Sequence, residues 1–117
     1  MNVRRRASIS THVLDTERGE PAAGVPVVLA RLEAGQEVPV GRGETDLDGR
    51  IAELLEGDLR PGIYRLTFDV AGYRRRRGGP PVFLARVSLD VLVEDVGRHY
   101  HVPLLLSPYA CTAYRGS

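Results

Sequence analysis

Two histidines spaced two residues apart, His99 and His101, are the side chains best suited to chemistry in this chain. Side chains two apart on a strand project from the same face, so both imidazoles would share one face of a sheet. A free imidazole exchanges protons near pH 6.5, and paired imidazoles therefore suit general acid–base catalysis. His12 is the third histidine, in another segment of alternating apolar residues. The spacing alone leaves open whether His12 joins the pair, or whether the pair only marks a solvated polar face.

A metal site is the competing interpretation of a His-x-His pair with a distant third histidine. Three imidazoles can hold zinc and leave one position open for water. No acidic residue stands directly beside His99 or His101, although Glu94 and Asp95 are near in the chain. The chain has no G-x-S-x-G elbow and no phosphate-binding loop, and Cys111 lacks a partner motif. If the protein is a hydrolase, we therefore expect water to be the attacking group.

The elements that must position these histidines are predicted to be short β-strands, because apolar and polar residues alternate along most of the chain. Strands are expected at residues 9–15, 24–32, 36–45, 63–70, 87–93 and 99–106, with a further one in 109–117. The strand at 24–32 is apolar on both faces, which predicts that both faces are covered. Residues 72–77 fit a short helix, but four arginines give it no apolar face. Such a pattern indicates an all-β sandwich.

Composition limits the classes of function. The 117 residues suit a single domain, 1–117, with residues 1–6 as a flexible extension. The arginine clusters at 4–6 and 74–77 are interpreted as solvated surface, since only Tyr73 offers a base-stacking ring nearby. A single cysteine excludes an intrachain disulfide, and no signal peptide or membrane-spanning stretch is visible. We expect a cytoplasmic protein that binds neither nucleic acid nor membrane.

Four segments, spread in order along the chain, resemble the signature motifs of a known family. They are ISTHVLDTERGEPAAGVPV (9–27), TDLDGR (45–50), HYHVPLLLSPY (99–109) and the final YRGS (114–117). Together they resemble the 5-hydroxyisourate hydrolases, which are related to transthyretin. The resemblance covers nearly the whole chain. It implies a transthyretin-like β-sandwich of two four-stranded sheets with at most one short helix, assembled as a homotetramer with active sites where two dimers meet.

The same resemblance implies the residues of the pocket, which are His12, Arg50, His99, His101, Tyr114 and Ser117. His12 and His101 would be the proton-handling pair. Arg50 would bind and polarise the substrate. Ser117, with its terminal carboxylate, would complete the catalytic set, and His99 and Tyr114 would contact the substrate.

The reaction implied by the resemblance is the hydrolysis of 5-hydroxyisourate to 2-oxo-4-hydroxy-4-carboxy-5-ureidoimidazoline in urate degradation. Water would attack a ring carbonyl with the help of histidine, and neither a metal nor an organic cofactor is expected. The rival interpretation is a non-enzymatic transthyretin-like module that binds a ligand or serves as structure. Glycine, proline and alternating apolar residues in the middle of the chain would serve such a module equally well, whereas the three histidines would have no use there.

Overall fold

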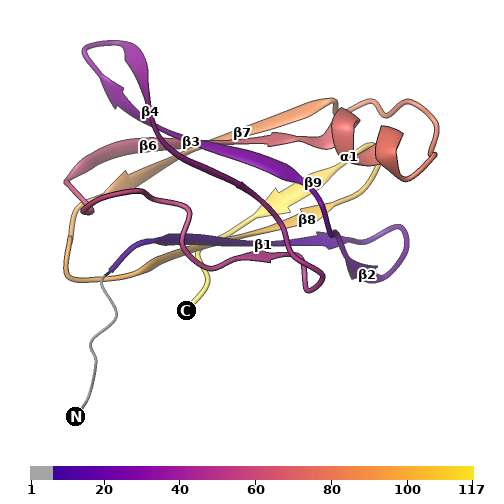
Figure 1. Ribbon diagram of the computed structural model, residues 1–117, viewed down its shortest axis with the longest axis horizontal. Helices are drawn as coiled ribbons and strands as arrows, with labels where there is room; N and C mark the ends of the chain where they lie inside the picture. The colour runs from indigo at the N-terminus through magenta and orange to yellow at the C-terminus, as the bar shows by residue number, and fades with distance from the viewer. Residues whose placement is uncertain (1–6) are drawn as a thin grey trace.

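The structure, a computed structural model, describes residues 7–117 as two β-sheets packed face to face with one short helix at one end (Figure 1). The extension predicted at residues 1–6 lies outside the described residues. In chain order the elements are β1 (Ile9–Asp15), β2 (Glu20–Pro21), β3 (Pro26–Glu33), β4 (Gln36–Glu44), β5 (Arg50–Ile51), β6 (Gly62–Asp69), α1 (Val70–Arg76), β7 (Arg86–Val93), β8 (Tyr100–Leu106) and β9 (Cys111–Ala113). The predicted all-β sandwich of two sheets with one short helix is confirmed, and within residues 7–117 the first sheet has five strands where four were expected, because the short β5 also pairs with β1.

The first sheet holds the strands that carry the histidines. Its strands follow the order β2-β1-β8-β9, and the two-residue β5 also pairs with β1. β1 and β8 run parallel, whereas β2 and β5 pair with β1 in antiparallel fashion. The second sheet has the order β4-β3-β6-β7 and is antiparallel throughout. β1 therefore lies between segments from the middle and from the end of the chain.

The core lies between the two sheets and is built from the inward residues of the alternating strands. In β6, Tyr64, Leu66 and Phe68 are almost fully buried, as the alternation predicts. Ile9 of β1 and Leu104 of β8 meet them from the other sheet as members of the same buried cluster. Burying one such apolar side chain stabilises the fold by about 1.5–3 kcal/mol. This burial fixes which faces of β1 and β8 point away from the core.

The prediction that the strand at 24–32 is covered on both sides is wrong. β3 buries Val27 and Leu29 against the other sheet, but Val28 on its outer face is 44% exposed. The outer face of this sheet stays open within the chain because the protein has only two layers. An apolar run on both faces therefore does not establish a central, doubly covered strand.

The helix also differs from the sequence-based expectation. α1 begins after Asp69, whose side chain accepts a hydrogen bond from the backbone N–H of Gly72 at 2.9 Å. Val70 and Tyr73 are buried in the core, so the helix does have an apolar face.

Within residues 7–117, no helix is long and apolar enough to cross a membrane.

The arginine cluster at 74–77 is not wholly a solvated surface, and the prediction is wrong for Arg74. The Arg74 side chain is only 5% exposed and forms ion pairs with Asp15 at 3.5 Å and with Glu17 at 2.9 Å. The next arginines lie nearer to solvent, and Arg77 pairs with Glu20 at 2.8 Å. Ion pairs of Arg74 and Arg77 therefore link α1 and the residue after it to the end of β1 and the segment that follows. The cluster at 4–6 lies outside the described residues.

Candidate active site

The strand register brings the predicted site residues together on the outer face of the first sheet. In the parallel pair, Ser10 of β1 lies opposite His101 of β8. In the antiparallel pair, His12 lies opposite Arg50 of β5. Ser10 and His12 are two residues apart on one strand and therefore share a face. Since residues opposite each other on neighbouring strands are about 5 Å apart, the outer face gathers residues from three strands.

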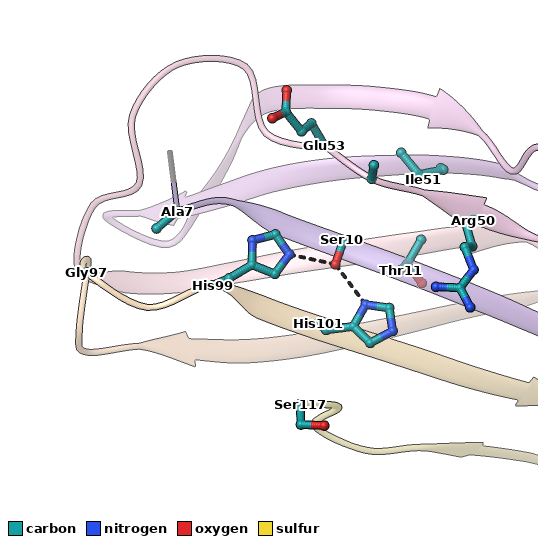
Figure 2. Close-up of a pocket in the computed structure, with 11 residues that line it drawn as sticks. Ala7, Ser10, Thr11, Arg50, Ile51, Glu53, Gly97, His99, His101 and Ser117 are labelled. Atoms are coloured by element: carbon teal, nitrogen blue, oxygen red, sulfur yellow. Dashed lines mark hydrogen bonds between the residues drawn. The ribbon is translucent and has the colours of Figure 1, made fainter. Parts of the chain in front are cut away.

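An open pocket of about 460 Å³ lies at this place. Figure 2 shows Arg50, His99, His101 and Ser117 around it, and the same residues line it together with Ser10. Four of the predicted pocket residues therefore meet in one cavity.

The other two predicted pocket residues lie beside this cavity. His12 is half-buried on the same face but is not among the residues that line the pocket. Tyr114 is exposed and lines a neighbouring groove between β7 and β8, together with Tyr100 and His101. The role of Tyr114 in substrate binding stays a prediction.

A serine hydroxyl joins the two histidines of the His-x-His pair. Ser10 Oγ lies 2.7 Å from His99 Nε2 and 2.7 Å from His101 Nδ1 (Figure 2). The backbone N–H of Ser8 donates to His99 Nδ1 at 3.2 Å. Sequence reasoning missed Ser10 as a site residue. Its place on the same face as His12 was the available signal, but only the register with β8 shows that it faces the histidines.

The surroundings of His101 favour a neutral imidazole. Burial lowers the pKa of His101 below its usual value, and electrostatic repulsion of its charged form by His12, Arg50 and His99 lowers it further. Desolvation disfavours the charged form, and positive neighbours act in the same direction. His101 is therefore uncharged near neutral pH, and a neutral imidazole can donate through one ring nitrogen and accept through the other.

A tight turn holds Arg50 beside β1. Asp46 Oδ1 accepts hydrogen bonds from the backbone N–H groups of Asp48 and Arg50, each at 2.9 Å, as predicted for a turn in TDLDGR. Gly49 has a φ of +77° and its carbonyl accepts from the N–H of Val13 at 2.7 Å. A Cβ at this position would lie 2.4 Å from the Val13 carbonyl oxygen. Glycine is therefore required where the turn approaches β1.

Close packing against His101 places Ser117 at the pocket. The backbone N–H of Gly116 donates to the His101 carbonyl at 2.8 Å, in an isolated antiparallel bridge. A Cβ on Gly116 would lie 2.5 Å from Cδ2 of the His101 ring. Because Gly116 has no side chain, it can pack directly against the imidazole of His101. Ser117, which follows it, then lines the pocket.

The imidazoles are engaged in hydrogen bonds rather than arranged as a ligand set. Both ring nitrogens of His99 and the Nδ1 of His101 have partners. In the part of the chain that the structure describes, no group of three His, Cys, Asp or Glu side chains is placed to hold a metal ion. That the protein uses no metal and no cofactor stays a prediction.

Fold and site together define a transthyretin-like β-sandwich that carries an imidazole–guanidinium pocket on one sheet. The chain belongs to the HIUase/Transthyretin family, whose profile matches residues 9–116. It is 47% identical to the 5-hydroxyisourate hydrolase of Deinococcus radiodurans, over 93% of this chain and 95% of that one.

Solved structures agree with this assignment. The 5-hydroxyisourate hydrolase of Klebsiella pneumoniae superposes with a TM-score of 0.83 at 33% identity, covering 95% of this chain and 99% of the other. Sea bream transthyretin, solved in complex with thyroxine, gives a TM-score of 0.86 at 28% identity, covering 94% of this chain and 95% of the other. Since one family fold serves both of these proteins, the side chains of the pocket must distinguish a hydrolase from a protein that binds thyroxine.

Proposed function

We propose that this chain hydrolyses 5-hydroxyisourate to 2-oxo-4-hydroxy-4-carboxy-5-ureidoimidazoline in urate degradation. The observation that carries the proposal is the register that gathers His12, Arg50 and His101 on one outer face of the family fold. Relatives with 5-hydroxyisourate hydrolase as their name support it at 40–47% identity over most of the chain. A cytoplasmic location for the reaction stays a prediction.

In the proposed reaction the guanidinium of Arg50 binds the substrate. The ring of 5-hydroxyisourate is electron-poor and readily ionised, and a planar guanidinium can pair with two of its oxygens at once. Arg50 lines the pocket together with His101 and Ser117 (Figure 2). A positive charge at this place also stabilises the negative charge that develops on the carbonyl oxygen during attack.

The imidazoles of His12 and His101 handle the protons. One imidazole takes a proton from water as the water oxygen attacks the ring carbonyl between N1 and C5. The bond from this carbon to N1 then breaks, and N1 receives a proton as it leaves, so that one water is consumed per ring opened. Positioned acid–base groups of this kind accelerate reactions by roughly 10²–10⁴-fold. Ser117 borders the same cavity and is proposed to complete it.

The direct test is a rate measurement with freshly made 5-hydroxyisourate. Purified protein is expected to speed the loss of the substrate well beyond its spontaneous decay, and to form one enantiomer of the product in excess. A second assay after treatment with a chelator is expected to give the same rate. A loss of activity that zinc restores would revive the metal interpretation, and no acceleration over buffer would leave a binding module as the function.

We also propose that the protein works as a homotetramer with its pockets where two dimers meet. The pocket lies on the outer face of the first sheet, where a facing copy of that sheet would cover it and exclude water. Sedimentation equilibrium is expected to give four times the chain mass of 12.8 kDa. A monomer with full activity would contradict the shared interface.

A further inference from the structure

The hydrogen bonds from Ser8 through His99 and Ser10 to His101 form a directed chain that the proposed reaction does not yet use. We infer that Ser10 is a positioning residue, which together with His99 holds His101 in the tautomer that carries its hydrogen on Nε2. The consequence for catalysis rests on the proposed function. The tautomer itself can be measured without any substrate.

The direction of donation along these hydrogen bonds is set by the backbone N–H of Ser8. The backbone N–H of Ser8 can only donate, and its acceptor is His99 Nδ1 at 3.2 Å. A ring nitrogen that accepts cannot carry a hydrogen, so neutral His99 holds its hydrogen on Nε2. Ser8 is 1% exposed, which makes the loss of this backbone hydrogen bond costly.

The Ser10 hydroxyl carries the same direction of hydrogen-bond donation from His99 to His101. His99 Nε2–H donates to Ser10 Oγ at 2.7 Å, which leaves the one hydroxyl hydrogen of Ser10 for its other partner. That partner is His101 Nδ1, also at 2.7 Å. Ser10 is 7% exposed, so water competes little for the hydroxyl. His101 Nδ1 therefore accepts, and the hydrogen of the neutral ring is on Nε2.

This tautomer divides the labour between the two catalytic imidazoles. The Nε2 of His101 is turned away from Ser10 (Figure 2) and presents an N–H group, not a lone pair. His101 therefore serves as a hydrogen-bond donor to the substrate carbonyl oxygen or to the departing ring nitrogen. The base that takes the proton from water is then His12, opposite Arg50 on the neighbouring strand.

The charged form of His101 is not compatible with this arrangement of hydrogen bonds. A second hydrogen, on Nδ1, would point at Ser10 Oγ and leave the hydroxyl hydrogen of Ser10 without its acceptor. The positive charge of Arg50 near the ring acts in the same direction. These hydrogen bonds therefore stabilise the neutral form of His101 that donates through Nε2–H.

The experiment is a nitrogen-15 NMR spectrum of the imidazoles in the wild-type protein at pH 7.5, where the two nitrogens of each tautomer have different shifts. We expect both His99 and His101 to show hydrogen on Nε2. A His101 that carries its hydrogen on Nδ1 would overturn the inference, whether or not the protein hydrolyses 5-hydroxyisourate. Conversely, the expected tautomer in a protein without activity would count against the proposed function alone.

Variants test what Ser10 contributes. In Ser10→Ala we expect a mixture of His101 tautomers and a kcat lower by roughly tenfold, with KM little changed, because one directing hydrogen bond is lost. Ser10→Thr keeps the hydroxyl and is expected to restore both readouts. An Ser10→Ala protein that folds and keeps the single tautomer would refute the positioning role.

A matched control separates positioning from strand stability. The hydroxyl of Thr16 donates to the Leu106 carbonyl at 3.0 Å and so links the far ends of the same two strands. Thr16→Ala is expected to leave the tautomer and kcat unchanged. If it alters kcat as much as Ser10→Ala does, the effect of Ser10 comes from strand pairing, and the inference fails.

Discussion

The two ends of β1 hold two polar clusters of different chemistry. At the far end, Asp15 is fully buried, and its carboxylate accepts from the Tyr73 hydroxyl at 2.9 Å and pairs with Arg74 at 3.5 Å. At the near end, a neutral hydroxyl, that of Ser10, joins two imidazoles. One cluster pairs opposite charges, whereas the other gathers groups that compete for protons.

The difference shows which cluster serves folding and which serves chemistry. Burial, and the hydrogen bond to Asp15 after it, raise the pKa of Tyr73 to about 12, so the phenol stays a donor at any ordinary pH. The pKa of His101 is lowered, so its imidazole is neutral near pH 7 and can both donate and accept a hydrogen bond. A histidine whose pKa is shifted by burial and by charged neighbours, in a cavity, marks a candidate reactive site. Tyr73, Asp15 and Arg74 are not among the residues that line that cavity, and their cluster stabilises the fold.

The largest expected effect is on activity, from a change at the pocket end. His101→Asn is expected to lower kcat/KM for 5-hydroxyisourate by roughly 10²–10⁴-fold, because a positioned proton-handling group is lost. The free energy of unfolding in urea should change by less than about 1 kcal/mol, since the ring is half-exposed. A variant that unfolds instead would show that the pocket end is structural as well.

Asp15→Ala should produce the opposite pattern. Removing the carboxylate leaves the Arg74 guanidinium buried, and its Nε and Nη2 already have no hydrogen-bond acceptor within residues 7–117. Breaking a buried ion pair in this way costs about 3–5 kcal/mol. Urea denaturation measures the loss. Glu20→Ala, which removes the exposed partner of Arg77, is the control and should cost no more than about 1 kcal/mol.

Tyr73→Phe sharpens the comparison with a smaller effect. It removes the hydrogen bond from the hydroxyl to the buried Asp15 carboxylate but keeps the ring in the core. A hydrogen bond to a charged group contributes about 1.5–3 kcal/mol. Thermal unfolding should show the loss, while kcat per folded molecule stays at the wild-type value. A lower kcat would indicate that the two ends of β1 are coupled.

The smallest expected effect is the change of stability with pH that His101 causes. The pKa of folded His101 lies below the value of an unfolded histidine, so below about pH 6.5 the unfolded chain binds more protons at this site. The His101 contribution to stability is therefore present above pH 6.5 and is lost as the pH falls through the lowered pKa. Denaturation at several pH values, with an NMR titration of the His101 ring, measures both. An unshifted His101 would contradict the description of the pocket.

The sequence predicted the faces of the strands better than their neighbours. Alternation placed His101 outward and Tyr100 inward, because period two is a local property of a strand. Which strands lie side by side is not local, so Ser10 could not be matched to His101 before the parallel register was known. The meeting of His12 and Arg50 likewise followed from the family resemblance, not from spacing.

The buried arginine was missed for a similar reason. A run of four arginines favours a solvated position on average, since charged groups are buried only when paired. The partner of Arg74 is Asp15, at the end of β1 in the first sheet (Figure 1), and no pattern within either segment connects the two. Tyr73 and Arg74 together therefore formed a cluster that only the tertiary structure shows.

The parallel pairing of β1 with β8 has a consequence for how the protein matures. The hydroxyl and the imidazole that meet at the pocket are 91 residues apart in the chain. Contacts between such distant segments form slowly, because a long loop must close before they contribute any stability. During synthesis, the pocket can therefore assemble only after the strand of His101 has left the ribosome, so enzymatic activity would report the last step of folding.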